Sequence, residues 1–544
     1  MAELLGLATD ELAANAESEY QAAYQDDYEI LIRFPNQSSI AAAHFASHHP
    51  HIVDQYWKLM RKAIANSDGF SDEAYHRFCS ITHRPFQIPQ ADAALEQVIQ
   101  GNHSYNGVMF SGKWLAEDMG LKLDANFSSQ QNQGDRADPN QAQSGAPSDT
   151  AKLRKIVNQI HKQVGFGDAS PSDWWVLLLA DGDGMGNYVN GRSLENYEQY
   201  LIHDLVNPTI KDKDEVWSDL LKTTKRMGPA THVGLNRALL DFSNRLVPHL
   251  IEHRYCGRVI YSGGDDVMAA LPLADLPGGV RSLRAAWSGK PDPEGEFESR
   301  GDYWWAKDSD RIAHLPQRPL FTMGWKATMS MGIVIAHKSV PLPMVLESLW
   351  EAESDRAKKL LGGGEYCDVE SSSTGDMLLV DTKPIPPKDG LCFRVIYGSG
   401  NTLEALMKGH LLDLWWEMVR ACTCDADALQ QADLSPVLNR LAEELPNHVM
   451  VTENDQLCRV ATVAIVNRRD EKLDEETKTA LLDWVEEWER WAWNAQQTAN
   501  KQDTSALGAS INDLANLLKF TAFWVTRRRL ELSWTEKARE VSHV

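Results

Sequence analysis

The sequence contains few cysteines, fewer basic than acidic residues, and no long uninterrupted run of apolar residues. Seven cysteines in 544 residues are an odd and sparse set, which favours a reducing cytoplasm over a framework of disulfides. No apolar run approaches the roughly 20 residues needed to cross a bilayer, and the first residues lack the basic segment of a secretory signal peptide. These absences lead us to expect a cytoplasmic protein that does not span a membrane.

Acidic residues outnumber basic ones. There are 77 Asp and Glu against 54 Lys and Arg, so the formal net charge is −23. A free-standing protein that binds nucleic acid without sequence preference is usually basic, so the charge argues against that class. It leaves room for a local basic groove, or for a role inside an assembly with basic partners. The remaining composition, 43% hydrophobic and 24% charged, is that of an ordinary globular protein.

The length of 544 residues is too great for one hydrophobic core, so we expect two to four domains. Residues 1–127 have a mixed but mainly helical pattern. Residues 128–172 begin with a stretch rich in Gln, Asn, Ser, Pro and Gly, which indicates a flexible linker followed by a lead-in helix. Apolar runs typical of strands occur in 173–400, whereas 401–544 has the pattern of an acidic, all-helical domain.

The block 173–400 alternates between strand and helix signals, and its polar segments 193–228 and 287–320 are interpreted as insertions. Strands are expected at 174–180, 258–261, 267–271, 327–335 and 391–397, and helices at 230–253, with a kink at Pro248, and at 342–361. This order predicts an α+β fold of the ferredoxin-like type, βαββαβ, with one extra strand. In its usual strand order the first strand lies antiparallel beside the third. The end of the first strand then falls next to the turn between the second and the third.

Two acidic clusters follow strand-like segments of this block. They are Asp181-Gly182-Asp183-Gly184-Met185-Gly186 and Gly263-Gly264-Asp265-Asp266. In the second, the glycines permit a tight turn between two strands, and the turn presents two adjacent carboxylates. Carboxylates and substrate phosphates are usual ligands of Mg²⁺. Because the predicted topology places both clusters side by side, they indicate a metal-dependent nucleotide-processing site.

Other interpretations of the first cluster are an acidic turn or a calcium loop. The calcium loop fails in detail, because Met185 and Arg192 occupy positions 5 and 12, where ligands are required. The glycines do not follow the dinucleotide fingerprint either. A degenerate nucleotide site that has lost its activity remains the alternative.

Three further groups of residues have both a structural and a functional interpretation. His76, Cys79 and His83 have the chemistry of metal ligands, but no fourth ligand is obvious. Trp484, Trp488 and Trp491 form a stripe that favours core packing or a subunit contact over base stacking. The basic triplet 527–529 fits a solvated helix face better than a contact with RNA or an acidic partner.

Three segments together resemble one family. They are 181–186 after a hydrophobic strand, 260–266 with its Gly-Gly-Asp-Asp, and 330–338. They are similar to the large polymerase/cyclase subunit of type III, Cmr-type, CRISPR effector complexes. The resemblance is strong over about 173–400 and weaker over 30–125. Over 401–544 it depends on position and helical character.

The resemblance implies a palm domain like those of diguanylate cyclases and class III nucleotide cyclases. In the family, binding of target RNA switches on the conversion of ATP into cyclic oligoadenylates, which act in antiviral defence. Carried over to this sequence, the catalytic carboxylates are Asp181, Asp265 and Asp266, which would hold Mg²⁺ or Mn²⁺. The residues that would contact ATP are Gly182, Asp183, Gly184, Ser262, Gly263, Gly264 and Lys358. Implied partners are the other effector subunits, with guide RNA and target RNA bound through the complex.

The sequence also departs from the family pattern. Family members usually begin with an HD nuclease domain and a first palm, and we find neither. The only His-Asp doublet, His203-Asp204, lies inside a predicted insertion. The cysteine zinc motif is missing as well, since Cys422-Thr423-Cys424 has the wrong place and spacing. We therefore expect a truncated or split subunit, with a separate chain as a source of the second palm or the HD nuclease.

Three hypotheses stay open at this point. The first is an RNA-activated cyclic oligoadenylate synthase subunit. The second is a non-catalytic subunit that holds nucleotide and acts as a scaffold. The third is a stand-alone nucleotide cyclase.

Overall fold

The computed structural model describes residues 34–542, with internal gaps. The gaps are 68–69, 82–84, 100–104, 122–147, 201–214, 308–311, 313, 369–380, 425, 452–455, 469–472 and 503. Most of the predicted linker, the His203-Asp204 doublet and His83 therefore lie outside the described residues.

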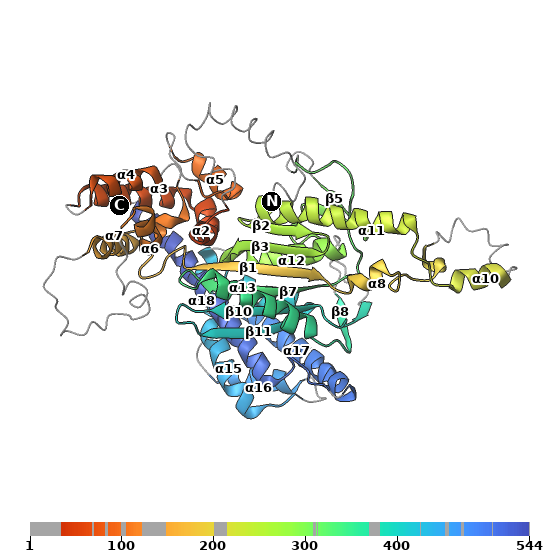
Figure 1. Ribbon diagram of the computed structural model, residues 1–544. Helices are drawn as coiled ribbons and strands as arrows, with labels where there is room; N and C mark the ends of the chain where they lie inside the picture. Colours follow the sequence, from red (N-terminus) through yellow and green to blue (C-terminus); the bar gives the residue numbers. More distant parts are fainter. Residues whose placement is uncertain are drawn as a thin grey trace, which may run out of the picture. The chain divides into compact units, whose positions relative to one another are not determined.

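A six-stranded sheet forms the centre of the described structure. Its strands are β1 (Trp174–Gly182), β2 (Arg258–Gly263), β3 (Asp266–Pro272), β7 (Met329–His337), β10 (Gly390–Ile396) and β11 (Thr402–Lys408). Their order is β11-β10-β7-β1-β3-β2 (Figure 1). The run β7-β1-β3-β2 is the ferredoxin-like arrangement, with β1 antiparallel to both of its neighbours. The predicted α+β fold is confirmed.

Strand β1 is apolar on both faces because helices cover both sides of the sheet. Trp174, Val176 and Leu178 contribute to one hydrophobic core, whereas Trp175 and Leu177 contribute to another. This alternation follows from the period of two in a β-strand. The first core joins the sheet to the C-terminal helices, and the second joins it to the N-terminal ones.

The described residues of the N-terminal region form helices and short turns. Its helices are α2 (Gln37–His48), α3 (Pro50–Ala65), α4 (Asp72–Ile81), α5 (Pro89–Glu96), α6 (Gly112–Asp118) and α7 (Asp149–Gln163). Helix α2 packs against β1 and β3. Helix α7 is the predicted lead-in helix to the first strand.

The prediction misassigned the second helix of the βαββαβ unit. That helix is α12 (Leu276–Ser288), between β3 and β7, and not the helix expected at 342–361. The sequence pattern does not predict this helix, because it begins with Leu276-Pro277-Gly278-Gly279, and glycine and proline disfavour a helix. Proline is nevertheless tolerated in the first turn, where its missing N–H has no intrahelical partner. Helix α13 (Leu342–Glu351) instead connects β7 to β10, which run parallel.

The expectation of an all-helical region from residue 401 also needs a correction. Strand β11 pairs with β10, so the sheet continues to Lys408. The helices that follow are α14 (Leu411–Arg420), α15 (Ser435–His448), α16 (Leu457–Val466), α17 (Glu475–Lys501) and α18 (Ile511–Ser542). The tryptophan stripe at 484, 488 and 491 on α17 is fully buried, which confirms its interpretation as core packing.

The predicted helix at 230–253 changes its geometry along its length. It begins as α11 (Pro229–Asp241) and continues as the π-helical turns η7 (Phe242–Leu246) and η8 (His249–Arg254). These wider turns lie on either side of Pro248, where the sequence predicts a kink. A π turn offers another way to accommodate the missing N–H.

The two predicted insertions contain short elements of their own. The first holds the turn η5 (Tyr197–Tyr200) and α10 (Glu215–Lys222) among its described residues. The second forms a small sheet of β4 (Phe297–Ser299), β5 (Tyr303–Ala306) and β6 (Leu320–Phe321). A further hairpin, β8 (Glu365–Asp368) and β9 (Asp381–Pro384), precedes β10.

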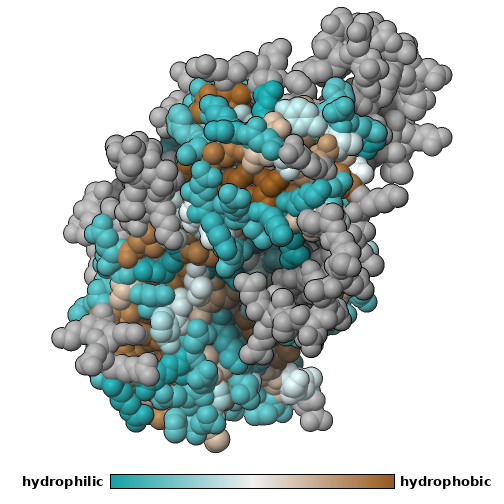
Figure 2. Space-filling view, turned by 90° about the vertical axis from the view of Figure 1, so that its left-hand side faces the viewer, coloured by the Kyte–Doolittle hydropathy of each residue, from teal (hydrophilic) through white to brown (hydrophobic). Residues whose placement is uncertain are grey.

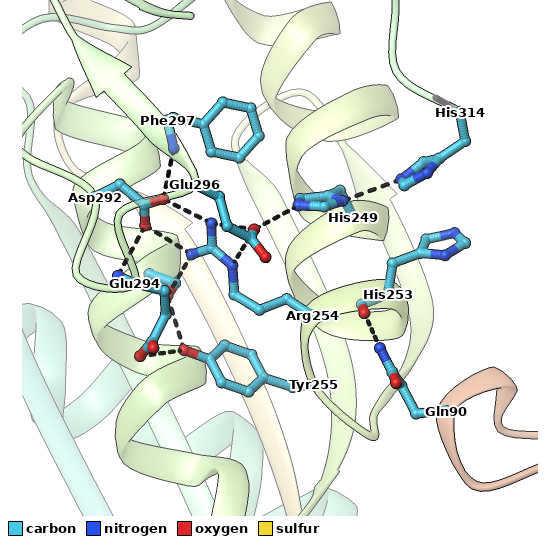
Figure 3. A network of polar contacts seen from close by, with 11 residues as sticks. Gln90, His249, His253, Arg254, Tyr255, Asp292, Glu294, Glu296, Phe297 and His314 are labelled. Atoms are coloured by element: carbon cyan, nitrogen blue, oxygen red, sulfur yellow. Dashed lines mark hydrogen bonds and ion pairs between the residues drawn. The ribbon is translucent and has the colours of Figure 1, made fainter. Parts of the chain in front are cut away.

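A buried ionic network joins η8 to the second insertion (Figure 3). The Arg254 guanidinium donates to both carboxylate oxygens of Asp292, each at 2.7 Å, and its Nε donates to Glu296 at 2.8 Å. His249 lies 3.0 Å from Glu296 and, through its other ring nitrogen, 3.0 Å from His314. Because the Asp292 side chain is fully buried, its charge depends on Arg254.

The surface mixes polar and apolar residues. Figure 2 shows one face, on which hydrophobic patches are interrupted by hydrophilic residues. In the described parts of the chain, no helix combines the length and the apolar character needed to cross a membrane.

We predict that Arg254→Ala lowers the free energy of unfolding by about 3–5 kcal/mol, because it leaves the buried Asp292 charge unpaired. Chemical denaturation of the full chain measures this loss. Arg300→Ala is the matched control, since Arg300 pairs with Glu298 in the same insertion but on the surface, and it should be neutral. A loss for Arg254→Ala no larger than for the control would contradict the assigned role.

Candidate active site at the end of strand β1

The structure brings the two acidic clusters together. Strand β1 pairs with β3 from Trp175↔Pro272 to Ala180↔Val267, so the next residues of β1 reach the turn between β2 and β3. A Cβ added to Gly182 would lie 2.9 Å from the Cβ of Asp265. The carboxylates of Asp181, Asp265 and Asp266 thus form one group, which we call the carboxylate cluster.

Two glycines permit this close arrangement. Gly182 faces the ring of Trp287, and any side chain there would collide with that ring and with Asp265. Gly264 has φ = +67°, a left-handed conformation that residues with a side chain rarely adopt. The tight hairpin and its approach to β1 therefore both require glycine.

Negative charge is concentrated in the carboxylate cluster. Burial, a hydrogen bond with Asp181, and the charges of Asp181 and Asp265 raise the pKa of Asp266 to about 6. Burial and the charge of Asp181 also raise the pKa of Asp265. Like charges at close range disfavour ionisation, so a cation beside these groups would stabilise their charged form.

One cation already lies there. The Nζ atom of Lys358 is 3.1 Å from Oδ2 of Asp181 and also contacts the carboxylate of Glu353. Burial works against the charge of Lys358, but hydrogen bonds with Glu353 and Asp181 outweigh it and raise the pKa of the ammonium. Lys358 therefore lies beside the carboxylate cluster, as predicted, together with Glu353, which belongs to no motif of the sequence.

Asp183 has surroundings different from those of Asp181. Its carboxylate accepts hydrogen bonds from the hydroxyls of Thr328 at 2.9 Å and Ser330 at 2.8 Å, and from the backbone N–H of Asp389 at 2.9 Å. The residue is buried, and burial raises its pKa. Its oxygens thus tie the end of β1 to β7 and to the start of β10. This arrangement favours a structural role over the predicted contact with nucleotide.

The remaining predicted residues surround the cluster in different ways. Ser262 donates its hydroxyl proton to the carbonyl of Ser243 at 2.9 Å, so its side chain has a structural partner. A Cβ added at Gly263 would meet the ring of Tyr261. By contrast, a Cβ added at Gly184 would meet only the side-chain nitrogen of Asn187, at 3.7 Å, and one added at Gly264, or at Gly186 of the same acidic cluster as Gly184, would have open space around it. The backbone at these three glycines has room for a ligand.

The side chains of the carboxylate cluster are suitable ligands for a divalent cation, because Mg²⁺ and Mn²⁺ prefer carboxylate oxygens. Among the described residues, however, no three His, Cys, Asp or Glu side chains are already arranged to hold a metal ion. His76 and Cys79, which the sequence offered as metal ligands, therefore belong to no such group among the described residues. A metal ion at the carboxylate cluster would therefore take phosphate oxygens or water as its remaining ligands.

The basic triplet 527–529 is mostly engaged within the chain. Arg528 pairs with Glu531, and Arg529 donates to the carbonyl of Ala428 at 2.8 Å. Arg527 lies over the rings of Trp174 and Phe523. These contacts favour a role within the chain over an RNA contact, but the predicted solvated helix face is wrong, because Arg528 is buried.

Comparisons with known proteins point to one family. Residues 175–298 match the family model "Cas10/Cmr2, second palm domain". A curated relative, "CRISPR system Cmr subunit Cmr2" of Pyrococcus furiosus, is 29% identical over 217 residues, which is 39% of this chain and 20% of the relative. This chain thus aligns with only a fifth of that relative's length. The match over 175–298 confirms the resemblance for the block that contains the carboxylate cluster.

Two solved structures are also similar. One is the apo state of the type III-B Cmr-beta complex, with 13% identity and a TM-score of 0.43 over 85% of this chain and 45% of that chain. The other is the same complex bound to cognate target RNA, with 13% identity and a TM-score of 0.45 over 85% of this chain and 46% of that chain.

We predict that Asp266→Asn stabilises the metal-free protein at pH 7.5 by on the order of 1 kcal/mol, allowing for solvent screening of this partly exposed group. Because the fold raises the pKa of Asp266 from 3.8 to about 6, the ionised form is disfavoured in the native state. The penalty is complete above pH 6, shrinks as the pH falls through 6, and is absent below 3.8.

Thermal unfolding of the variant and the wild type between pH 3.5 and pH 8 measures this difference. Asp168→Asn is the control, because the Asp168 side chain is 96% exposed and should be neutral at every pH. An advantage of Asp266→Asn that did not depend on pH would show that charge is not its cause.

Proposed function

We propose that this chain is the palm-bearing part of a type III CRISPR effector large subunit, because residues 175–298 match the family model of the second palm domain of Cas10/Cmr2. Its proposed reaction is the conversion of ATP into cyclic oligoadenylates when the assembly binds target RNA. The observation that carries the proposal is the convergence of Asp181, Asp265 and Asp266 beside Lys358.

Each residue of this group has a task that its chemistry suits. Joining two ATP molecules requires a ribose hydroxyl to attack an α-phosphate while pyrophosphate leaves. The three carboxylates would hold Mg²⁺ or Mn²⁺, which when bound would neutralise charge on the phosphate oxygens. Lys358 would add a point charge on the triphosphate. The open backbone at Gly186 and Gly264 would let the triphosphate come close.

The proposed partners are other type III effector subunits, with guide RNA and target RNA reached through them. The name of the curated relative, a Cmr subunit, supports this assignment. The net charge of −23 supports RNA binding through partner subunits rather than through this chain alone.

A second candidate function is a non-catalytic subunit that holds nucleotide. Two observations favour it. Lys358 already pairs with Asp181, and the described residues contain no group of three ligands that is ready to take a metal ion. A site of this kind would bind ATP through Lys358 without turning it over.

We predict that Asp265→Asn and Asp266→Asn each reduce cyclic oligoadenylate formation by about 100-fold or more, because each removes a charge that the metal ion needs. The measurement uses the chain co-purified with its partner subunits and incubated with ATP, Mg²⁺ and cognate RNA. Both isosteric changes should leave assembly intact, which size-exclusion chromatography shows. Asp168→Asn serves as the surface control.

The outcomes separate the candidates. Undiminished product from both variants would rule out catalysis by the carboxylate cluster. ATP binding by the wild type without product in any assembly would establish the non-catalytic role instead. Product formed by the purified chain without RNA would point to a stand-alone cyclase.

A further inference from the structure

The segment after α13 departs from a regular helix beside the carboxylate cluster. Helix α13 ends at Glu351 and is followed by the π-helical turn η10 (Ala352–Arg356) and the 3₁₀ turn η11 (Ala357–Lys359). Irregular turns of this kind occur frequently at functional sites. Here they place two charged side chains, Glu353 and Lys358, next to each other.

The spacing of this pair depends on the irregular turns. Glu353 and Lys358 are five residues apart, whereas side chains that face each other on an α-helix are three or four apart. Glu353 lies in the π turn and Lys358 in the 3₁₀ turn after it, so the two turns together bring the pair onto one side. The regular helix predicted for 342–361 would have kept the two side chains apart.

Strand β7 fixes the position of the π turn. A Cβ added to Gly332 would lie 2.7 Å from the backbone nitrogen of Glu353 and 2.9 Å from its Cβ. The turn therefore rests directly on the backbone of the sheet, at a residue without a side chain. Glu353 is 6% exposed, so its carboxylate has little freedom to move.

A buried carboxylate at this position destabilises the folded state unless another interaction offsets the cost of its burial. Burial raises the pKa of Glu353, and the nearby charges of Asp181 and Asp183 raise it further, while Lys358 opposes them. An apolar residue of similar size would fill the same space without that cost. The pairing with Lys358 is the interaction that offsets it.

We propose that Glu353 is a positioning residue of the nucleotide site. It anchors the ammonium of Lys358 at the edge of the carboxylate cluster, where that ammonium also contacts Asp181. When a triphosphate arrives, Lys358 exchanges Asp181 for a phosphate oxygen, and the contact with Glu353 keeps the amine in place. Asp181 is then released for other ligands. This inference rests on the proposed function, because it assumes that the site binds a nucleoside triphosphate.

The test is the affinity of the full chain for ATP with Mg²⁺, measured by calorimetry for Glu353→Gln. We expect the Kd to rise about 10-fold, a loss of about 1.4 kcal/mol. In the active assembly, KM for ATP should rise similarly while kcat changes by about twofold or less, because Lys358 contacts the triphosphate before and during the reaction. Glu353→Asp should recover part of the affinity, since it retains the charge.

A double-mutant cycle shows whether Glu353 acts through Lys358. In a Lys358→Gln background, Glu353→Gln should cost no further affinity. Glu347→Gln is the matched control, because it removes one exposed negative charge from α13. Thermal unfolding of every variant establishes that it is folded.

Each result has a distinct meaning. If the wild type binds ATP and Glu353→Gln binds it equally well, the positioning role is wrong and the proposed function stands. A full additional loss in the Lys358→Gln background would assign Glu353 to the fold and overturn the inference. If the wild-type chain and assembly bind no ATP with Mg²⁺, the proposed function itself fails, and the positioning role fails with it.

Discussion

The pairing of β1 with β3 and β7 is the constraint on which the rest of the site depends. β1 is the central antiparallel strand, apolar on both faces, and its end lies against the Gly-Gly hairpin. A shift of this register by one residue would exchange the two faces of β1 and separate Asp181 from Asp265. Burial of an apolar strand thus determines where the carboxylates meet.

The site concentrates negative charge and balances it with cations held by the protein. Lys358 pairs with Asp181, and Arg284 pairs with Asp389, whose backbone N–H donates to Asp183. These contacts explain how a chain with an excess of acidic residues brings several of them together. These contacts also give the two neighbouring aspartates different roles. Asp181 stays accessible at the cluster, whereas Asp183 is used to join strands.

Local patterns predicted the sheet well and its connections less well. The strands expected at 258–261, 267–271 and 391–397 match β2, β3 and β10 to within two residues, because each is a short apolar run bounded by turn residues. Helix α12 was missed because its first turn contains proline and two glycines. The π turn after α13 was missed because helical periodicity predicts side-chain spacing, not the width of a turn.

The residue types that end β1 and form the hairpin can be read from the amino-acid sequence, and they define the chemistry that the site offers. Which of these groups face one another depends on how the strands and turns pack together. The bond between Asp183 and Asp389 joins residues 206 positions apart, and Glu353 meets Lys358 through a turn that no local pattern reveals. Local patterns report burial and backbone preference along a few residues. A contact between distant segments exists only after the sheet has aligned its strands.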